Sequence, residues 1–347
     1  MTDSSAGKPP RRERYNGKNP RRFDQKYKEH QADRYTADVE KILACGKTPA
    51  GSHRPIMVDE ILAVLKPMPG EIAVDCTLGH GGHASRLLQA IQPGGKLIAL
   101  DADPLELPKT EARLRATGCE PESLIVVRSN FIGLAHSLAI HAAGGVDLLL
   151  ADLGLSSMQI DDPKRGFSYK HDGPLDMRMN PLKGLAASEW LAKISVTELA
   201  QVLTENADEP QAEPLARAIL QAQSRSPLTT TQSLVAIVRR VLSNNSETTA
   251  SSTVQRVFQA IRIAVNDEFG ALDALLRQLS TCMKPGGRIA ILSFHSGEDR
   301  RVKRAFKSGL ASGAFAQISE DVTRTTFSEQ HANPRSAAAK LRWAIRA

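Results

Sequence analysis

A glycine-rich segment, residues Gly79–His83, has the residue types and spacing of a cofactor-binding turn. It follows an apolar run that ends at Asp75, and a helical pattern begins directly after it. Glycines at a strand-to-helix turn let backbone amides approach a ligand closely. The next apolar run ends at Asp101, where a carboxylate can accept both ribose hydroxyls of an adenosine-containing cofactor. The pair predicts a nucleoside cofactor, although the glycines alone also fit the looser dinucleotide fingerprint.

Two more apolar runs end in polar side chains that could meet a substrate. Asp152 ends the run that starts at Val146, and Ser293 and His295 follow the run that starts at Gly286. Ligands of open parallel sheets bind beyond the carboxyl ends of the strands, so Asp152, Ser293 and His295 are the candidates for catalytic residues. The alternative makes Asp152 a turn or helix-cap residue and His295 a structural residue.

These side chains need a parallel sheet to bring them to one edge. Short apolar runs at 71–75, 96–101, 123–128, 146–152 and 286–294 are separated by helical patterns, which predicts a doubly wound α/β fold. The alternating segment 340–346 predicts a last, antiparallel strand. Between the fourth and fifth strands the patterns are helical only, and a long helix is expected over about 253–281.

The chain therefore divides into three predicted parts. Residues 1–50 are predicted to form a disordered basic extension, because residues 1–36 contain no Ile, Leu or Val and hold ten Lys and Arg against five Asp and Glu. Residues 51–156 and 264–347 form the α/β domain, and 157–263 form an inserted all-helical domain. The extension could bind nucleic acid through its basic and tyrosine residues, or it could be a dispensable solvated tail.

Composition excludes several classes of protein. No stretch approaches the roughly 20 apolar residues of a membrane span, and no apolar core of a signal peptide precedes the folded part. The four cysteines lack zinc-like spacing. We expect a cytoplasmic enzyme with no metal site and no membrane contact; the oligomeric state stays open, with a homodimer possible.

A set of ordered motifs resembles the RsmH (MraW) family, which methylates the N4 amine of a cytidine in the decoding centre of bacterial 16S rRNA. The resemblance covers about residues 53–347. The matching motifs are 53–60 (HRPIMVDE), 75–83 (DCTLGHGGH), 152–157 (DLGLSS), 165–168 (RGFS), 172–179 (DGPLDMRM), 258–268 (FQAIRIAVNDE), 293–296 (SFHS) and 333–336 (NPRS).

The resemblance implies a Rossmann-like class I methyltransferase sheet, S-adenosylmethionine as the methyl donor, and 16S rRNA within the small ribosomal subunit as the partner. Gly81, Gly82 and His83 would hold the methionine end of the donor, and Asp101 would hold the ribose. Phe131 would border the adenine, and Asp152 and Gln159 would complete the site. Residues expected to contact the substrate are Arg178, Arg262, Asn266, Ser293 and His295.

Two other functions stay open beside the methyltransferase. An NAD-dependent oxidoreductase could use the same glycine turn, and a non-enzymatic ribosome-assembly factor could keep the fold as a scaffold for RNA. For Arg262 and Asn266, which share one face of the long helix, a solvated helix flank is the alternative to substrate contact. The residue that would orient the cytosine amine is not readable from the sequence.

Overall fold

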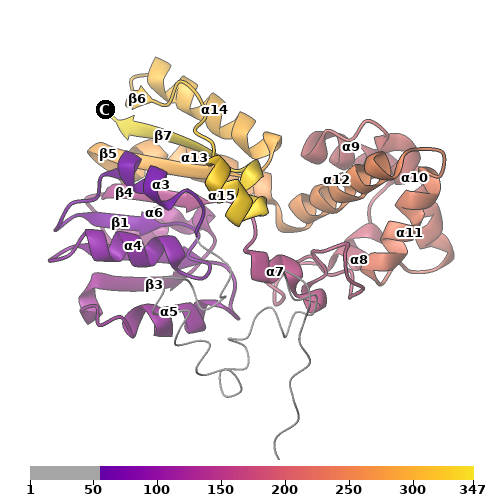
Figure 1. Ribbon diagram of the computed structural model, residues 1–347, viewed down its shortest axis with the longest axis horizontal. Coiled ribbons are helices and arrows are strands. Elements are labelled where there is room, and N and C mark those ends of the chain that lie inside the picture. The colour runs from indigo at the N-terminus through magenta and orange to yellow at the C-terminus, as the bar shows by residue number, and fades with distance from the viewer. Residues whose placement is uncertain (1–54) are drawn as a thin grey trace, which may run out of the picture. The chain divides into compact units, whose positions relative to one another are not determined.

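The computed structural model describes residues 55–347, so the predicted extension, residues 1–50, lies outside the described residues. Within the described range the chain forms a seven-stranded sheet in the order β3-β2-β1-β4-β5-β7-β6 (Figure 1). The strands are β1 (Ile72–Asp75), β2 (Lys96–Asp101), β3 (Leu124–Arg128), β4 (Val146–Asp152), β5 (Met283–Ser293), β6 (Phe315–Ile318) and β7 (Lys340–Arg346). Neighbours among β1 to β5 pair in parallel, whereas β7 is antiparallel to both β5 and β6.

Helices cover both faces of the sheet because its strands are buried on both sides. One face packs against α3 (Val58–Leu65), α4 (Gly82–Ala90) and α5 (Leu107–Arg115). The other packs against α6 (Leu134–His141), α13 (Glu268–Cys282) and α14 (Ser296–Ala311). Successive residues of β4 alternate between the two layers: Leu148 and Leu150 join the first cluster, and Leu149 and Ala151 join the second. Because β1 to β5 run in parallel, the polar residues that end them lie at one carboxyl edge of the sheet.

The chain between β4 and α13 is mostly helical and has an apolar cluster of its own. Its helices are α7 (Ser157–Asp161), α8 (Ala187–Leu191), α9 (Val196–Ala207), α10 (Ala212–Arg225), α11 (Thr231–Val241) and α12 (Glu247–Asn266). Leu175 and Met177, from the long loop before α8, are buried in the same cluster. Because this core is separate from the two cores of the sheet, we propose that the helical segment is a distinct domain, called the insertion below.

The helix expected over 253–281 is wrong as a single element. The structure has two helices, α12 and α13, separated at Asp267, whose backbone is left-handed (φ 48°, ψ 44°). The spacing of apolar residues continues through both helices, so periodicity cannot reveal a break at one residue. Asp is among the few residues other than glycine that tolerate this conformation.

Two further differences concern strands. β5 begins at Met283, three residues before the predicted start, and β6 was not expected at all. β6 is a four-residue edge strand with two exposed positions, too short for a clear alternating pattern. The α/β fold with a Rossmann-like sheet is confirmed. Among residues 55–347, no helix combines the length and apolar character that a membrane span requires.

Candidate cofactor and acceptor site

The glycine turn joins β1 to α4 at the carboxyl edge of the sheet. Gly79 and Gly81 have left-handed backbones (φ 48° and 72°), which glycine adopts without strain. A Cβ on Gly81 would lie 2.8 Å from Thr110 Cγ2, and one on Gly82 would lie 2.8 Å from Pro55 Cγ. The turn is therefore closely packed from behind. No side chain caps the N-terminus of α4, so its first backbone N–H groups can receive a negatively charged group.

His83 and Asp152 face each other beside that helix end. The Nε2 atom of His83 lies 3.5 Å from Oδ2 of Asp152. His83 Nε2 and Asp152 Oδ1 are both buried, and neither has a hydrogen-bond partner among the described residues. Buried polar atoms without partners are costly and rare in folded proteins. The two atoms fit a polar ligand that carries both positive and negative groups, as the amino-acid end of S-adenosylmethionine does.

Asp75, which was not among the predicted site residues, lies directly behind this pair. It is 1% exposed at the end of β1. Burial raises its pKa from 3.8 to about 6, against the opposing effects of a hydrogen bond from Thr77 N and of the nearby His83. Thr77 also accepts a hydrogen bond from Asp152 N at 2.7 Å through its hydroxyl. This hydrogen bond joins the ends of β1 and β4. The sequence signal that could have selected Asp75 is its place as the polar end of a strand directly before the glycine turn.

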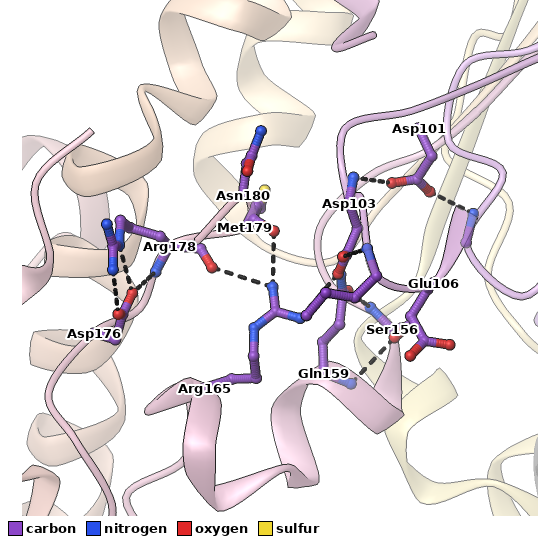
Figure 2. Close-up of polar contacts among 12 residues, drawn as sticks. Asp101, Asp103, Glu106, Ser156, Gln159, Arg165, Asp176, Arg178, Met179 and Asn180 are labelled. Atoms are coloured by element: carbon purple, nitrogen blue, oxygen red, sulfur yellow. Dashed lines mark hydrogen bonds and ion pairs between the residues drawn. The ribbon is translucent and has the colours of Figure 1, made fainter. Parts of the chain in front are cut away.

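Asp101 closes β2 and supports the glycine turn (Figure 2). Its Oδ2 accepts a hydrogen bond from Gly79 N at 2.6 Å, and its Oδ1 accepts one from Asp103 N at 2.8 Å. Burial raises the pKa of Asp101 despite these hydrogen bonds. A carboxylate offers about four lone-pair sites, so Asp101 can still accept hydrogen bonds from two hydroxyls of a ligand.

The predicted cofactor residue Gln159 is held by protein at both ends of its amide (Figure 2). Its Oε1 accepts a hydrogen bond from Ser156 N at 3.0 Å, and its Nε2 donates one to Asp103 Oδ2 at 2.8 Å. The same Asp103 oxygen accepts a hydrogen bond from Arg165 Nη1 at 2.9 Å. Burial acts to raise the pKa of Asp103, but these hydrogen bonds, with one from Leu105 N, outweigh it and lower the pKa.

Arg165 connects this carboxylate to the loop before α8. Its Nη2 donates to Met179 O at 2.7 Å and to Arg178 O at 3.2 Å. From the other side, Asn266 accepts a hydrogen bond from Met179 N and donates one to Met177 O, both at 2.7 Å. The loop segment 176–180 is thus clamped between the β2 end and the end of α12. Three distant parts of the chain supply these groups, and no local pattern could have assembled them.

The predicted substrate residues are engaged in contacts within the protein. Arg262 forms a two-pronged ion pair with Glu268 at 2.7 and 2.9 Å, and Arg178 pairs with Asp176 at 2.6 Å. Arg262 is mostly buried, so its predicted alternative, a solvated flank, does not describe it. Asn266 uses its amide oxygen and one N–H on the clamp, and Nδ2 also donates to Arg262 O at 2.8 Å within α12.

The end of β5 is organised by a buried carboxylate, Glu298. His295 is the N-cap of α14, and its Nδ1 accepts a hydrogen bond from Glu298 N at 3.4 Å. Its Nε2 lies 3.2 Å from Glu298 Oε1. Burial acts to raise the pKa of Glu298, yet the hydrogen bond and charge of His295 outweigh it, and the pKa is lowered. Ser293 is buried, with its hydroxyl 3.4 Å from Lys340 O. These contacts give His295 a structural role, and its contact with substrate stays a prediction.

The strand ends bring the predicted cofactor residues to one edge, with β4 and β5 as neighbours. Phe131 begins a short 3-10 helix after β3. It lies two residues beyond Ser129, whose N–H donates to Asp101 O at 3.0 Å. Phe131 therefore follows the end of β3, the strand that pairs with the end of β2 at Asp101, and the carboxyl edge continues through Asp152 to Ser293.

Comparison with known proteins identifies relatives over nearly the whole chain. A family model described as the MraW methylase family matches residues 50–347. A protein of Lachnoclostridium phytofermentans named "Ribosomal RNA small subunit methyltransferase H 1" is 46% identical over 342 residues, which is 97% of this chain and 93% of that protein. "Ribosomal RNA small subunit methyltransferase H 2" of Alkaliphilus metalliredigens is 44% identical over 350 residues, with 99% of this chain and 100% of that protein covered.

A more distant relative, "Ribosomal RNA small subunit methyltransferase H" of Granulibacter bethesdensis, is 38% identical over 316 residues. That alignment covers 86% of this chain and 92% of the relative. The alignment with the Alkaliphilus protein covers 99% of the chain, so it includes most of residues 1–50. The basic extension therefore has a counterpart in at least one relative.

Proposed function

The chain belongs to the MraW methylase family, and on that premise we propose that it transfers a methyl group from S-adenosylmethionine to the N4 amine of a cytidine in the decoding centre of 16S rRNA. The substrate is the small ribosomal subunit, which places the enzyme in the cytoplasm. The observation that carries the proposal is the pair of buried atoms without a hydrogen bond, His83 Nε2 and Asp152 Oδ1, beside the uncapped start of α4.

The residues at successive strand ends fit successive parts of the methyl donor. The N–H groups at the start of α4 and His83 would hold its carboxylate, and Asp152 would accept from its amine. Asp101 would accept from the ribose hydroxyls, and Phe131 would border the adenine. When bound, the donor supplies an electrophilic methyl group on a positively charged sulfur.

The chain's own residues must then align the acceptor. The lone pair of a cytosine amine is delocalised into the ring, so hydrogen-bond acceptors have to hold the amino hydrogens and turn the lone pair toward the methyl group. Positioning at near-attack distance supplies much of the rate enhancement in such reactions. Since the sulfur's charge disappears on transfer, a site that stabilised that charge strongly would slow the reaction.

The carboxylates of the site argue against a dinucleotide cofactor. Asp75, Asp101 and Asp152 lie close enough that the charges of Asp101 and Asp152 raise the pKa of Asp75. A pyrophosphate at the start of α4 would add two more negative charges to this group. The amino-acid end of S-adenosylmethionine carries one positive and one negative group, which matches an uncapped helix end beside a carboxylate.

Titration calorimetry with S-adenosylmethionine and with NAD tests the cofactor. We expect binding of the first only. Asp152→Asn and His83→Asn should each weaken that binding by roughly 10- to 100-fold, because each removes a charge-assisted hydrogen bond worth about 1.5–3 kcal/mol. As a control, Arg217→Met at an exposed ion pair in α10 should leave the affinity unchanged. Tight binding of NAD would overturn the assignment.

Methyl transfer is tested with small subunits from a strain that lacks the corresponding gene. Incubation with radiolabelled S-adenosylmethionine, followed by mass spectrometry of the rRNA nucleosides, should yield N4-methylated cytidine. Incorporation into another nucleoside would refute the proposed acceptor. Binding of the subunit without any incorporation would favour the non-enzymatic assembly factor.

A further inference from the structure

The positive charge of the described chain is concentrated on one helix. Residues 1–54 hold 13 of the 45 Lys and Arg and 7 of the 38 Asp and Glu, which leaves 32 against 31 in residues 55–347. Within that nearly neutral body, α14 alone has five Lys and Arg against two Asp and Glu. The remainder of the body is therefore slightly negative.

The two carboxylates of α14 point into the protein, and four of its five cations are exposed. Glu298 is 4% exposed, and Asp299 pairs with Arg342 at 2.6 Å. Lys303, Arg304 and Lys307 are exposed, and the structure gives none of these three a carboxylate partner within residues 55–347. Their charge is left available to solvent or to a ligand.

The position of α14 connects these cations to the candidate site. The helix starts at Ser296, three residues after the end of β5, so its first turn lies at the carboxyl edge of the sheet. Arg300, in the second turn, pairs with Asp208 at the end of α9, at 3.0 Å, which holds this end of α14 against the insertion (Figure 1). From Arg300 to Lys307 the cations extend about 10 Å along the helix axis, leading away from the site.

We propose that the exposed face of α14, formed by Arg300, Lys303, Arg304 and Lys307, contacts successive phosphates of the substrate RNA. The proposal rests on the proposed function, since it assumes an RNA whose base enters the sheet edge. A row of Lys and Arg side chains neutralises phosphates and releases their counterions. Such contacts position a nucleic acid without reading its sequence.

The insertion is the competing surface, and its charge does not favour the same role. Residues 157–263 hold 12 Lys and Arg against 11 Asp and Glu. Several of its cations are already paired, as Arg239 is with Glu247 and Arg256 is with Glu209. The insertion can contribute shape recognition, whereas α14 supplies the charge.

The test compares two double variants that remove the same charge. Arg304→Gln/Lys307→Gln alters α14, and Arg86→Gln/Lys96→Gln alters α4 and the amino end of β2, away from the site. Binding of the full chain to unmethylated small subunits is measured between roughly 50 and 200 mM salt. Calorimetry with S-adenosylhomocysteine shows whether each variant is folded with an intact cofactor site.

The α14 variant should reduce the slope of log K against log salt by about 1.4, at about 0.7 for each lost phosphate contact. If the two proteins bind equally at 1 M salt, this change in slope makes the α14 variant bind about 15-fold more weakly than the wild type near 150 mM salt. The control should keep the wild-type slope. Equal losses in both variants would show a general effect of net charge and would overturn the proposal, as would an unchanged α14 variant. A wild-type protein that neither binds nor methylates subunits would instead refute the proposed function.

Discussion

Replacing Arg165 by methionine should destabilise the protein more than any exposed charge change. The side chain is almost fully buried, and its guanidinium reaches Asp103, which is 2% exposed, at 2.9 Å. The variant leaves that carboxylate with only Gln159 and Leu105 N as donors and removes a hydrogen bond to Met179 O. Breaking a buried pair by removing one partner costs about 3–5 kcal/mol. Because Asp103 keeps two donors, we expect about 3 kcal/mol.

The measurement is urea unfolding, followed separately in the insertion and in the sheet. The chain has two tryptophans: Trp190 in α8 and Trp343 in β7. Trp→Phe at one position leaves the other as a local probe. In the wild type the two transitions should coincide, and in Arg165→Met both midpoints should fall. Non-coincident transitions in the variant would show that Arg165 also couples the unfolding of the insertion to that of the sheet.

The matched control is Arg217→Met, which breaks an ion pair with Glu213 whose side chains are 70% and 67% exposed. Exposed pairs contribute about 0–1 kcal/mol, so this variant should unfold almost as the wild type does. Adding Asp103→Asn to Arg165→Met should recover part of the loss, because the unpaired buried charge is removed. If the free energy of unfolding of Arg165→Met fell by less than about 1 kcal/mol at an unchanged m-value, the proposed contribution of the buried ion pair would be refuted.

Two other predictions follow from the site and its supporting loop. Asp75→Asn should raise the free energy of unfolding near pH 7.5 by up to about 3 kcal/mol, at 1.36 kcal/mol for each unit of pKa shift, while it weakens cofactor binding. The folded-state pKa of Asp75 is raised to about 6, so the folded protein binds more protons than the unfolded chain between pH 3.8 and 6, and wild-type stability falls as pH rises through that window. The advantage of the variant should therefore disappear by about pH 4, and an advantage independent of pH would contradict the assignment. Gly166→Ala should cost roughly 2–4 kcal/mol, because the new Cβ would lie 2.1 Å from Pro174 O at φ 70°. Gly118→Ala, at φ 83° with nothing within 4 Å, should cost only about 1 kcal/mol; equal losses in thermal or urea unfolding would show that the contact with Pro174 does not matter.

The sheet was predictable from the sequence because its strands are buried on both faces. Runs such as 97–100 and 148–151 are continuously apolar and are each followed by an aspartate, which indicates both the strand and its carboxyl end. β6 escaped prediction because an edge strand of four residues needs only one buried side chain. The break at Asp267 escaped because a single left-handed residue leaves the apolar spacing intact.

The candidate site was predictable where its residues lie at strand ends, and not where they act through distant partners. The resemblance to a family singled out Gln159, yet the structure shows its amide holding Asp103, a residue that no motif selected. Arg165 entered the sequence analysis only as the first residue of the motif 165–168 (RGFS), since its partners lie 62, 13 and 14 residues away. Spacing that irregular carries no periodic signal.

The clamp on segment 176–180 connects the cofactor end of the site to the insertion. Asp101 and Asp103 belong to one short turn, in which Asp101 accepts a hydrogen bond from Asp103 N. A ligand bound by Asp101 therefore contacts the turn that contains Asp103. Arg165 connects this turn to Met179, and Asn266 connects Met179 to the end of α12. If the insertion contacts the proposed RNA substrate and cofactor binding stiffens this turn, that RNA binds with less ordering to be done, and by linkage it must strengthen cofactor binding by the same factor. S-adenosylhomocysteine affinity measured with and without small subunits should show this reciprocity in the wild type and lose it in Arg165→Met.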